Sequence, residues 1–122
     1  MNIIKINING TRFEFVCESR GTRSGFAHDC TLFINDIREQ KVHCYYINRT
    51  WECWRYQSVC VEAVNAEIQY YTQRMLDKWK GENGYSRMTK TRKTDFDKYV
   101  ENIPYIQTLK QCKQELKDKL WN

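Results

Sequence analysis

The chain of 122 residues has the length of one domain, a net charge of +5, one proline and five glycines, so extensive disorder is not expected. No apolar run approaches the roughly eighteen residues that a membrane-spanning helix needs, so the sequence predicts no such helix. The first residues, MNIIKINING, lack the basic segment and long apolar run of a signal peptide, and we expect a cytoplasmic protein.

The first part of the chain, residues 1–47, predicts an antiparallel sheet. In IIKINI the isoleucines alternate with polar residues, which is the pattern of a half-buried strand. The Asn-Gly pair at 9–10 predicts a tight hairpin turn. The following TRFEFVCES predicts a second strand, paired with the first, with Phe13, Phe15 and Cys17 on one face.

Two further strands are predicted over 26–34 and 41–47. RGTRSG, residues 20–25, is expected to form a loop because of its glycines and serine, and Asn-Asp at 35–36 predicts a turn. If the loop between strands three and four has an odd number of residues, Val42, Cys44 and Tyr46 of KVHCYYI join the apolar face. An even number would place the lysine and histidine there, so we predict the odd loop.

Beyond the sheet, the sequence predicts helices. From about residue 50 the apolar spacing changes to three and four, which indicates one long amphipathic helix over 50–80. A basic connector is expected over 85–93. Helices over 94–121 follow, with Thr94 as the first N-cap in a capping box and Pro104 between them. The stripe of the long helix is Cys53, Cys60, Val64, Ile68, Tyr71, Met75 and Trp79.

Together these elements predict a single domain of the α+β class. Four antiparallel strands, in two hairpins, come first, and a long helix and two C-terminal helices then pack on one face of the sheet.

Positive charge is concentrated in three places. Two arginines lie in RGTRSG, and RMTKTRK at 87–93 has four cations and no acid. In NRTWECWRYQSVC, an arginine four residues after a tryptophan could stack on its indole near the helix start. We therefore expect a nucleic-acid or acidic-protein partner, the alternative being that these side chains are solvated surface and the tryptophan covers the sheet edge. The candidate binding residues are Arg20, Arg23, Arg49, Trp51, Arg55, Arg87, Lys90, Arg92 and Lys93.

Residues with metal-ligand chemistry cluster once in the predicted strands, at His28, Cys30, His43 and Cys44. At most three of them converge in the predicted register, and a structural zinc site has four ligands, so we predict no metal. The six cysteines are expected to be free thiols, mostly in the core.

A catalytic site is not predicted. A nucleophilic pair of Cys30 with His28 or His43 is chemically possible, but no strained turn presents a cysteine. No phosphate-binding glycine motif occurs either. We expect a protein that is not an enzyme and has no cofactor.

Two segments, GFAHDCTLFIN and YYINRTWECWRYQS, carry a resemblance to known proteins. Within residues 20–59, about a third of the chain, the sequence resembles small accessory proteins encoded by phages and prophages of Gram-positive bacteria. The resemblance brings no established active site. Proteins of this size and origin include anti-CRISPR inhibitors, which block an RNA-guided nuclease at its nucleic-acid channels or subdomain contacts. The resemblance thus implies a phage accessory protein in a bacterial host and, as a further step, a nuclease inhibitor.

Many such inhibitors are acidic mimics of DNA, and a chain with a net charge of +5 departs from that pattern. A basic inhibitor would bind guide RNA, target DNA or an acidic protein surface. Our first expectation is therefore a non-enzymatic phage-type protein that binds and inhibits a bacterial nuclease complex. In the most specific form of this hypothesis, the protein is an anti-CRISPR inhibitor. The alternative is a basic regulatory protein that binds nucleic acid without a nuclease target. Neither hypothesis involves a membrane.

Overall fold

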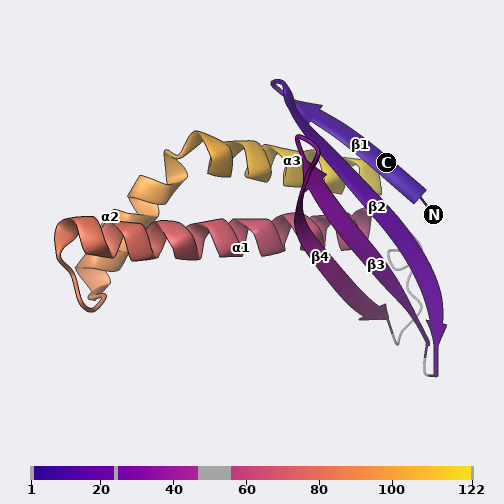
Figure 1. Ribbon diagram of the computed structural model, residues 1–122, viewed down its shortest axis with the longest axis horizontal. Coiled ribbons are helices and arrows are strands. Elements are labelled where there is room, and N and C mark those ends of the chain that lie inside the picture. Colours follow the sequence, from indigo (N-terminus) through magenta and orange to yellow (C-terminus); the bar gives the residue numbers. More distant parts are fainter. Residues whose placement is uncertain (1, 24, 47–55, 122) are drawn as a thin grey trace.

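The computed structural model describes residues 2–23, 25–46 and 56–121 (Figure 1). Four strands form one antiparallel sheet in the order β1-β2-β3-β4, and the helices pack against it, which confirms the predicted α+β class. No helix in these ranges has an apolar stretch long enough to cross a membrane. The elements are β1 (Asn2–Ile8), β2 (Thr11–Thr22), β3 (Gly25–Ile34), β4 (Ile37–Tyr46), α1 (Tyr56–Asn83), α2 (Lys90–Glu101) and α3 (Pro104–Trp121).

The turn between β1 and β2 is the predicted Asn-Gly hairpin. Asn9 and Gly10 have φ angles of 50° and 90°, the left-handed conformations that this two-residue turn requires. The side chain of Asn7 supports the turn by accepting a hydrogen bond of 2.9 Å from the backbone N–H of Gly10.

The loop predicted over 20–25 is much shorter in the structure. β2 continues to Thr22, β3 begins at Gly25, and these two residues pair directly with each other. The prediction was wrong because it gave the glycines and the serine more weight than strand pairing. Continuous pairing of Arg20 with Ala27 and of Gly21 with Phe26 satisfies the backbone groups that a loop would leave to water.

The connection between β3 and β4 is a two-residue turn at Asn35 and Asp36, with φ angles of 50° and 68°. The predicted odd loop is therefore wrong, and β4 begins at Ile37, four residues earlier than the predicted start. A bulge corrects the register, because Leu32 pairs with Gln40 while Phe33 pairs with Arg38, leaving Glu39 as the extra residue.

Beyond the bulge, the predicted sidedness of β4 is confirmed. Cys30 pairs with Val42 and His28 pairs with Cys44, and both β4 side chains pack against the core. A one-residue insertion in the strand therefore has the same effect on the later register as an odd loop would have.

The core lies between the sheet and helices α1 and α3. The predicted inward face of β2 is fully buried, and so is the apolar stripe of α3 from Ile106 to Leu116. On α1, Cys60 and Val64 are buried, and the later stripe residues are partly buried against the core. Cys53 lies outside the described residues. The largest fully buried apolar side chains are Phe13, Phe15, Leu32, Ile106, Leu109, Leu116, Val59 and Val64.

The helix boundaries differ from the predicted ones. α1 ends at Asn83 rather than residue 80, and Gly84 follows in the left-handed conformation with φ 69°. The part of the predicted helix at 50–55 lies outside the described residues.

The basic connector is shorter than predicted because α2 begins at Lys90. Its N-cap is Thr89, whose hydroxyl accepts from the backbone N–H of Arg92 at 3.2 Å. Thr94 was predicted to be the cap, but its hydroxyl donates to the carbonyl of Lys90 inside the helix. The earlier cap is favoured because it gives the helix another turn before Phe96, which is buried.

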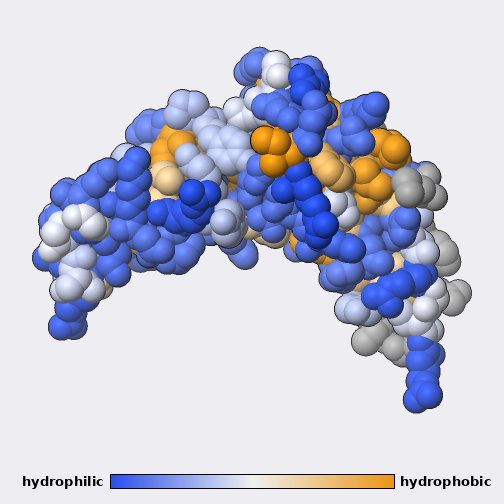
Figure 2. Space-filling view, in the orientation of Figure 1, coloured by the Kyte–Doolittle hydropathy of each residue, from blue (hydrophilic) through white to orange (hydrophobic). Residues whose placement is uncertain are grey.

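The molecule is arched, with the sheet at one end and α2 at the other (Figure 2). α2 packs on α1 and α3 rather than on the sheet. In this view the helical arm carries mainly hydrophilic side chains, whereas apolar side chains gather where the sheet meets the helices.

Candidate nucleic-acid interface

Arg20, a predicted binding residue, lies on the outer face of the sheet and is already paired. Its Nε donates to Asp29 at 3.2 Å, and its Nη2 donates to the hydroxyl of Tyr45 at 3.1 Å. Both bonds raise the pKa of the guanidinium, and the bond with Tyr45 has the larger effect. Arg20 and Tyr45 flank Ala27 on the neighbouring strands and Ala27 is fully buried, so the pair shields this part of the sheet.

Asp29 also contacts His43, whose Nδ1 lies 2.5 Å from the second carboxylate oxygen. The hydrogen bond with His43, and to a smaller extent the one with Arg20, lowers the pKa of Asp29 against the effect of its partial burial. Arg20 is therefore part of a closed charge network, which makes it a poorer phosphate ligand than the sequence suggested.

The structure describes only one of the other binding residues predicted outside the 87–93 patch. Arg23 is exposed at the turn between β2 and β3. Arg49, Trp51 and Arg55 lie outside the described residues, so their role stays a prediction.

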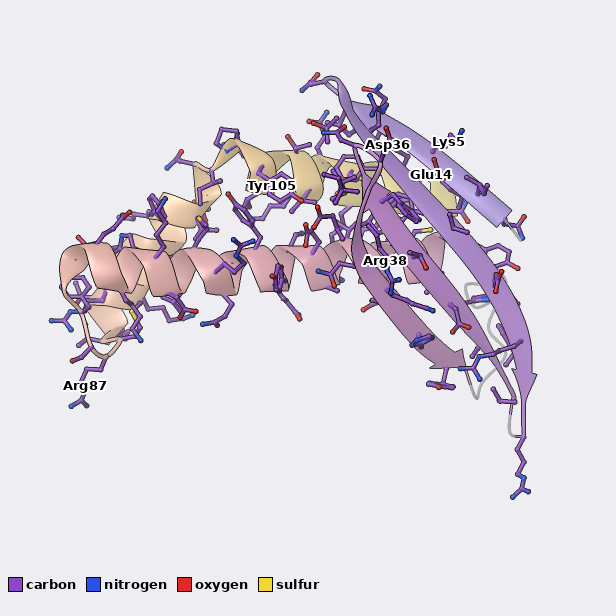
Figure 3. The ribbon with its side chains drawn as sticks, viewed as in Figure 1. Lys5, Glu14, Asp36, Arg38, Arg87 and Tyr105 are labelled. Carbon is purple, nitrogen blue, oxygen red and sulfur yellow. The ribbon has the colours of Figure 1, made fainter. Side chains whose placement is uncertain are left out.

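The patch predicted at 87–93 lies at the opposite end of the molecule from the β2–β3 turn (Figure 3). Arg87, Lys90 and Lys93 are exposed, but Arg92 folds back. Its Nη1 donates to the carbonyl of Arg87 at 2.9 Å, and its Cζ lies 4.0 Å from the ring centre of Tyr85. Arg92 therefore stabilises the local fold.

The first turn of α2 contains three cations and no acidic residue. Positive charge at a helix N-terminus is unfavourable because the helix dipole is positive there. A bound anion would relieve this repulsion, which keeps the patch a candidate for phosphate contact.

A second basic surface lies in a groove between α1 and α3. The groove has a volume of about 390 Å³ and is lined by three lysines, three amide side chains and one isoleucine. No carboxylate lines it. Its residues are Asn65, Ile68, Gln69, Lys110, Lys113, Gln114 and Lys117.

Helical spacing explains why the lysines face the groove together. Lys110, Lys113 and Lys117 follow one another at three and four residues, so they occupy one stripe of α3. The neighbouring stripe is fully buried and fixes the helix against α1. Asn65 and Gln69, one turn apart on α1, form the facing wall.

The three lysines are free to contact an anion. In the described part of the chain, none of them forms an ion pair with a carboxylate. Seven helical residues span about 10 Å, the axial length of about three phosphates in one strand of a DNA duplex. Their mutual repulsion would be reduced by phosphates placed between them.

Sequence reasoning missed this groove because it looked for the densest run of cations. The three-and-four spacing of the lysines in the last helix was a usable signal. The facing amides could not have been assigned, because they come from α1 and depend on how the two helices pack.

Of the two Cys–His pairs considered, the sheet separates one, Cys30 with His43. His43 contacts Asp29 on the outer face, whereas Cys30 is buried on the inner face. His28 shares that inner face, but its Nδ1 lies 2.6 Å from the hydroxyl of Ser19. The sheet therefore does not bring His43 and Cys30 together.

Comparisons of this chain with models of protein families, with curated proteins and with solved structures found no match.

Proposed function

We propose that this protein is a non-enzymatic binding protein that contacts the phosphate backbone of nucleic acid through the groove between α1 and α3. The observation that carries the proposal is the set of three lysines without carboxylate partners in an acid-free groove. Lysine ammonium groups and side-chain amides are donors that recur in contacts with phosphate and sugar. This mode of binding is independent of base sequence.

A more specific form of the proposal comes from the sequence resemblance to phage accessory proteins. In this form the nucleic acid belongs to a bacterial nuclease complex, and the protein inhibits the complex as an anti-CRISPR inhibitor would. The order of the two sequence-based hypotheses is thus reversed, because the groove supports phosphate binding and the nuclease target rests on resemblance alone.

The direct test is fluorescence anisotropy with labelled single- and double-stranded DNA and RNA at several salt concentrations. The wild type is compared with a triple variant, Lys110→Gln, Lys113→Gln and Lys117→Gln. We expect weaker binding by the variant and a log–log salt slope that is smaller by about 2 to 3, since each phosphate contact contributes about 0.9.

A matched control removes the same charge elsewhere. Lys5, Lys41 and Lys98 are exposed on β1, β4 and α2, away from the groove, and their change to Gln should lower affinity much less. Equal losses in the two triple variants would show that only net charge matters and would contradict the groove. Absence of binding to every nucleic acid tested would contradict the proposal as a whole.

A cleavage assay with a guide-loaded nuclease separates the two forms of the proposal. Inhibition that is lost in the groove variant supports a nuclease inhibitor that acts through nucleic acid. Binding to naked nucleic acid without inhibition supports the regulatory protein instead.

A further inference from the structure

Three cysteines from three different elements meet in the core. Cys17 of β2 and Cys30 of β3 are directly opposite each other in the sheet, and Cys60 lies on the face of α1 that covers them. All three side chains are fully buried. Their Sγ atoms lie within 4.8 Å of one another, and those of Cys17 and Cys60 are 3.5 Å apart.

This spacing matches that of a metal ion bound by three sulfurs. With metal–sulfur bonds of about 2.3 Å, three sulfurs in a trigonal plane lie about 4.0 Å apart. The Cys17–Cys60 distance of 3.5 Å and the limit of 4.8 Å for all three pairs lie on either side of this value. The three sulfurs are therefore already close to the separation that a shared ion would impose.

The ligand set selects the kind of ion. Thiolates are soft ligands that prefer monovalent copper, zinc and iron–sulfur clusters to calcium, magnesium or manganese. Among the described residues, no fourth histidine, cysteine or carboxylate joins the cluster within that distance. Structural zinc requires four ligands, whereas monovalent copper is satisfied by three thiolates.

We propose that Cys17, Cys30 and Cys60 form a binding site for one monovalent copper ion. The site is distinct from the lysine groove and does not depend on the proposed function. It also differs from the metal cluster considered from the sequence, of which only Cys30 takes part.

Copper binding needs the three cysteines as thiolates. Coordination by all three sulfurs therefore releases the thiol protons to solvent, Cu⁺ keeps its oxidation state and no electron is transferred.

The test is an anaerobic titration of the reduced protein with Cu⁺ in competition with a chromogenic copper chelator. We expect one tightly bound ion for each chain, a thiolate-to-copper absorption band in the ultraviolet and a higher melting temperature. The variant Cys60→Ala should lose all three effects. Cys112 is also a fully buried cysteine, in α3 and outside the cluster, and Cys112→Ala should retain them.

Two further experiments control for copper binding by other thiols and for loss of folding in the Cys60→Ala variant. Cys44 is outside the cluster, and Cys53 lies outside the described residues. The double variant Cys44→Ala, Cys53→Ala removes both thiols, and it should still bind one ion. If Cys60→Ala does not fold, alkylation of the wild type with and without Cu⁺ replaces it. Peptide mapping should then show that copper slows the alkylation of the three cluster cysteines and leaves that of Cys44, which is only partly buried, unchanged.

Several results would overturn the proposal. They are unchanged copper binding by a folded Cys60→Ala variant, equal protection of all cysteines, or weak binding without a defined stoichiometry. Binding of Zn²⁺ that Cu⁺ cannot displace would overturn the assignment to copper. A Cys17–Cys60 disulfide in the purified protein, with no copper bound after its reduction, would assign the cluster to redox chemistry instead.

Discussion

The two ends of α1 are stabilised in different ways. At the sheet end, Val59, Cys60, Ala63 and Val64 are fully buried between the strands and α3. At the far end, Trp79 is only partly buried. Its ring lies 5.3 Å from that of Tyr85 and 5.5 Å from that of Phe96.

This difference shows how one helix can belong to regions of unequal stability. The sheet end is covered on several sides, so opening it exposes the main core. The far end is covered by α2 and by the ring of Tyr85 rather than by the sheet, so local opening of α2 would break these contacts without unfolding the sheet. Each prediction below tests this contrast, beginning with the largest expected effect.

Removal of a large side chain at the sheet end should be the most destabilising change. Phe15 is fully buried, and Phe15→Ala should lower the free energy of unfolding by about 3 to 5 kcal/mol. Chemical denaturation followed by circular dichroism measures this loss. Phe96→Ala removes the same atoms at the far end, and we expect a smaller global loss with faster hydrogen exchange confined to α2. Equal global losses from the two variants would contradict the contrast.

Midway along α1, the side chain of Glu67 forms a hydrogen bond to α3 and another to β4. The carboxylate of Glu67 is buried and accepts from Gln40 at 3.0 Å and from the hydroxyl of Tyr105 at 2.5 Å. Tyr105 lies on the side of α3 that faces α1 (Figure 3). Tyr105→Phe should cost about 1.5 to 3 kcal/mol, since the acceptor is charged.

The matched control is Tyr70→Phe, because Tyr70 is 54% exposed and the change should alter stability by less than about 0.5 kcal/mol. Burial and the bond to Glu67 both raise the pKa of Tyr105. Its contribution is therefore complete below the unfolded pKa of about 10 and declines as the pH rises beyond it. The wild type should lose stability above that pH more steeply than Tyr105→Phe, and parallel profiles would contradict this account.

Loss of the α2 cap should affect the far end alone. Thr89→Ala removes the acceptor for the N–H of Arg92 and should cost about 1 kcal/mol. The measurement is hydrogen exchange of the α2 amides, which should accelerate while those of the sheet do not. Thr91, which lies two residues later inside α2 and is exposed, provides the control. Equal acceleration in Thr91→Ala would show that Thr89 is not the cap.

The smallest effect is expected from the cation on Tyr85. Arg92→Ala removes a guanidinium 4.0 Å from the ring centre and should cost about 0.5 to 1 kcal/mol. Lys93→Ala, at the exposed neighbouring position, should change stability by less than about 0.5 kcal/mol. Thermal denaturation of the two variants compares them. If Lys93→Ala is the more damaging change, the stacking of Arg92 does not stabilise this end.

Local patterns in the sequence determined most of the secondary structure. The alternation in the strands and the three-and-four spacing in the helices identified the buried faces of β2, α1 and α3, because burial on one side imposes these periods on any such element. The positions of the turns at Asn9 and Asn35 were likewise readable, since few residues tolerate the left-handed conformation.

Tertiary structure decided the features that depend on the meeting of distant segments. The bulge at Glu39 restores the register of β4, Arg20 and Arg92 are occupied by nearby groups, and the lysine groove forms between two helices. The cysteine cluster needs both a strand pair and a docked helix. A periodic pattern states which face of an element is apolar, but it does not state which atoms of another element that face will touch. Docking alone settles those contacts, because the energy of each depends on distances between residues far apart in the chain.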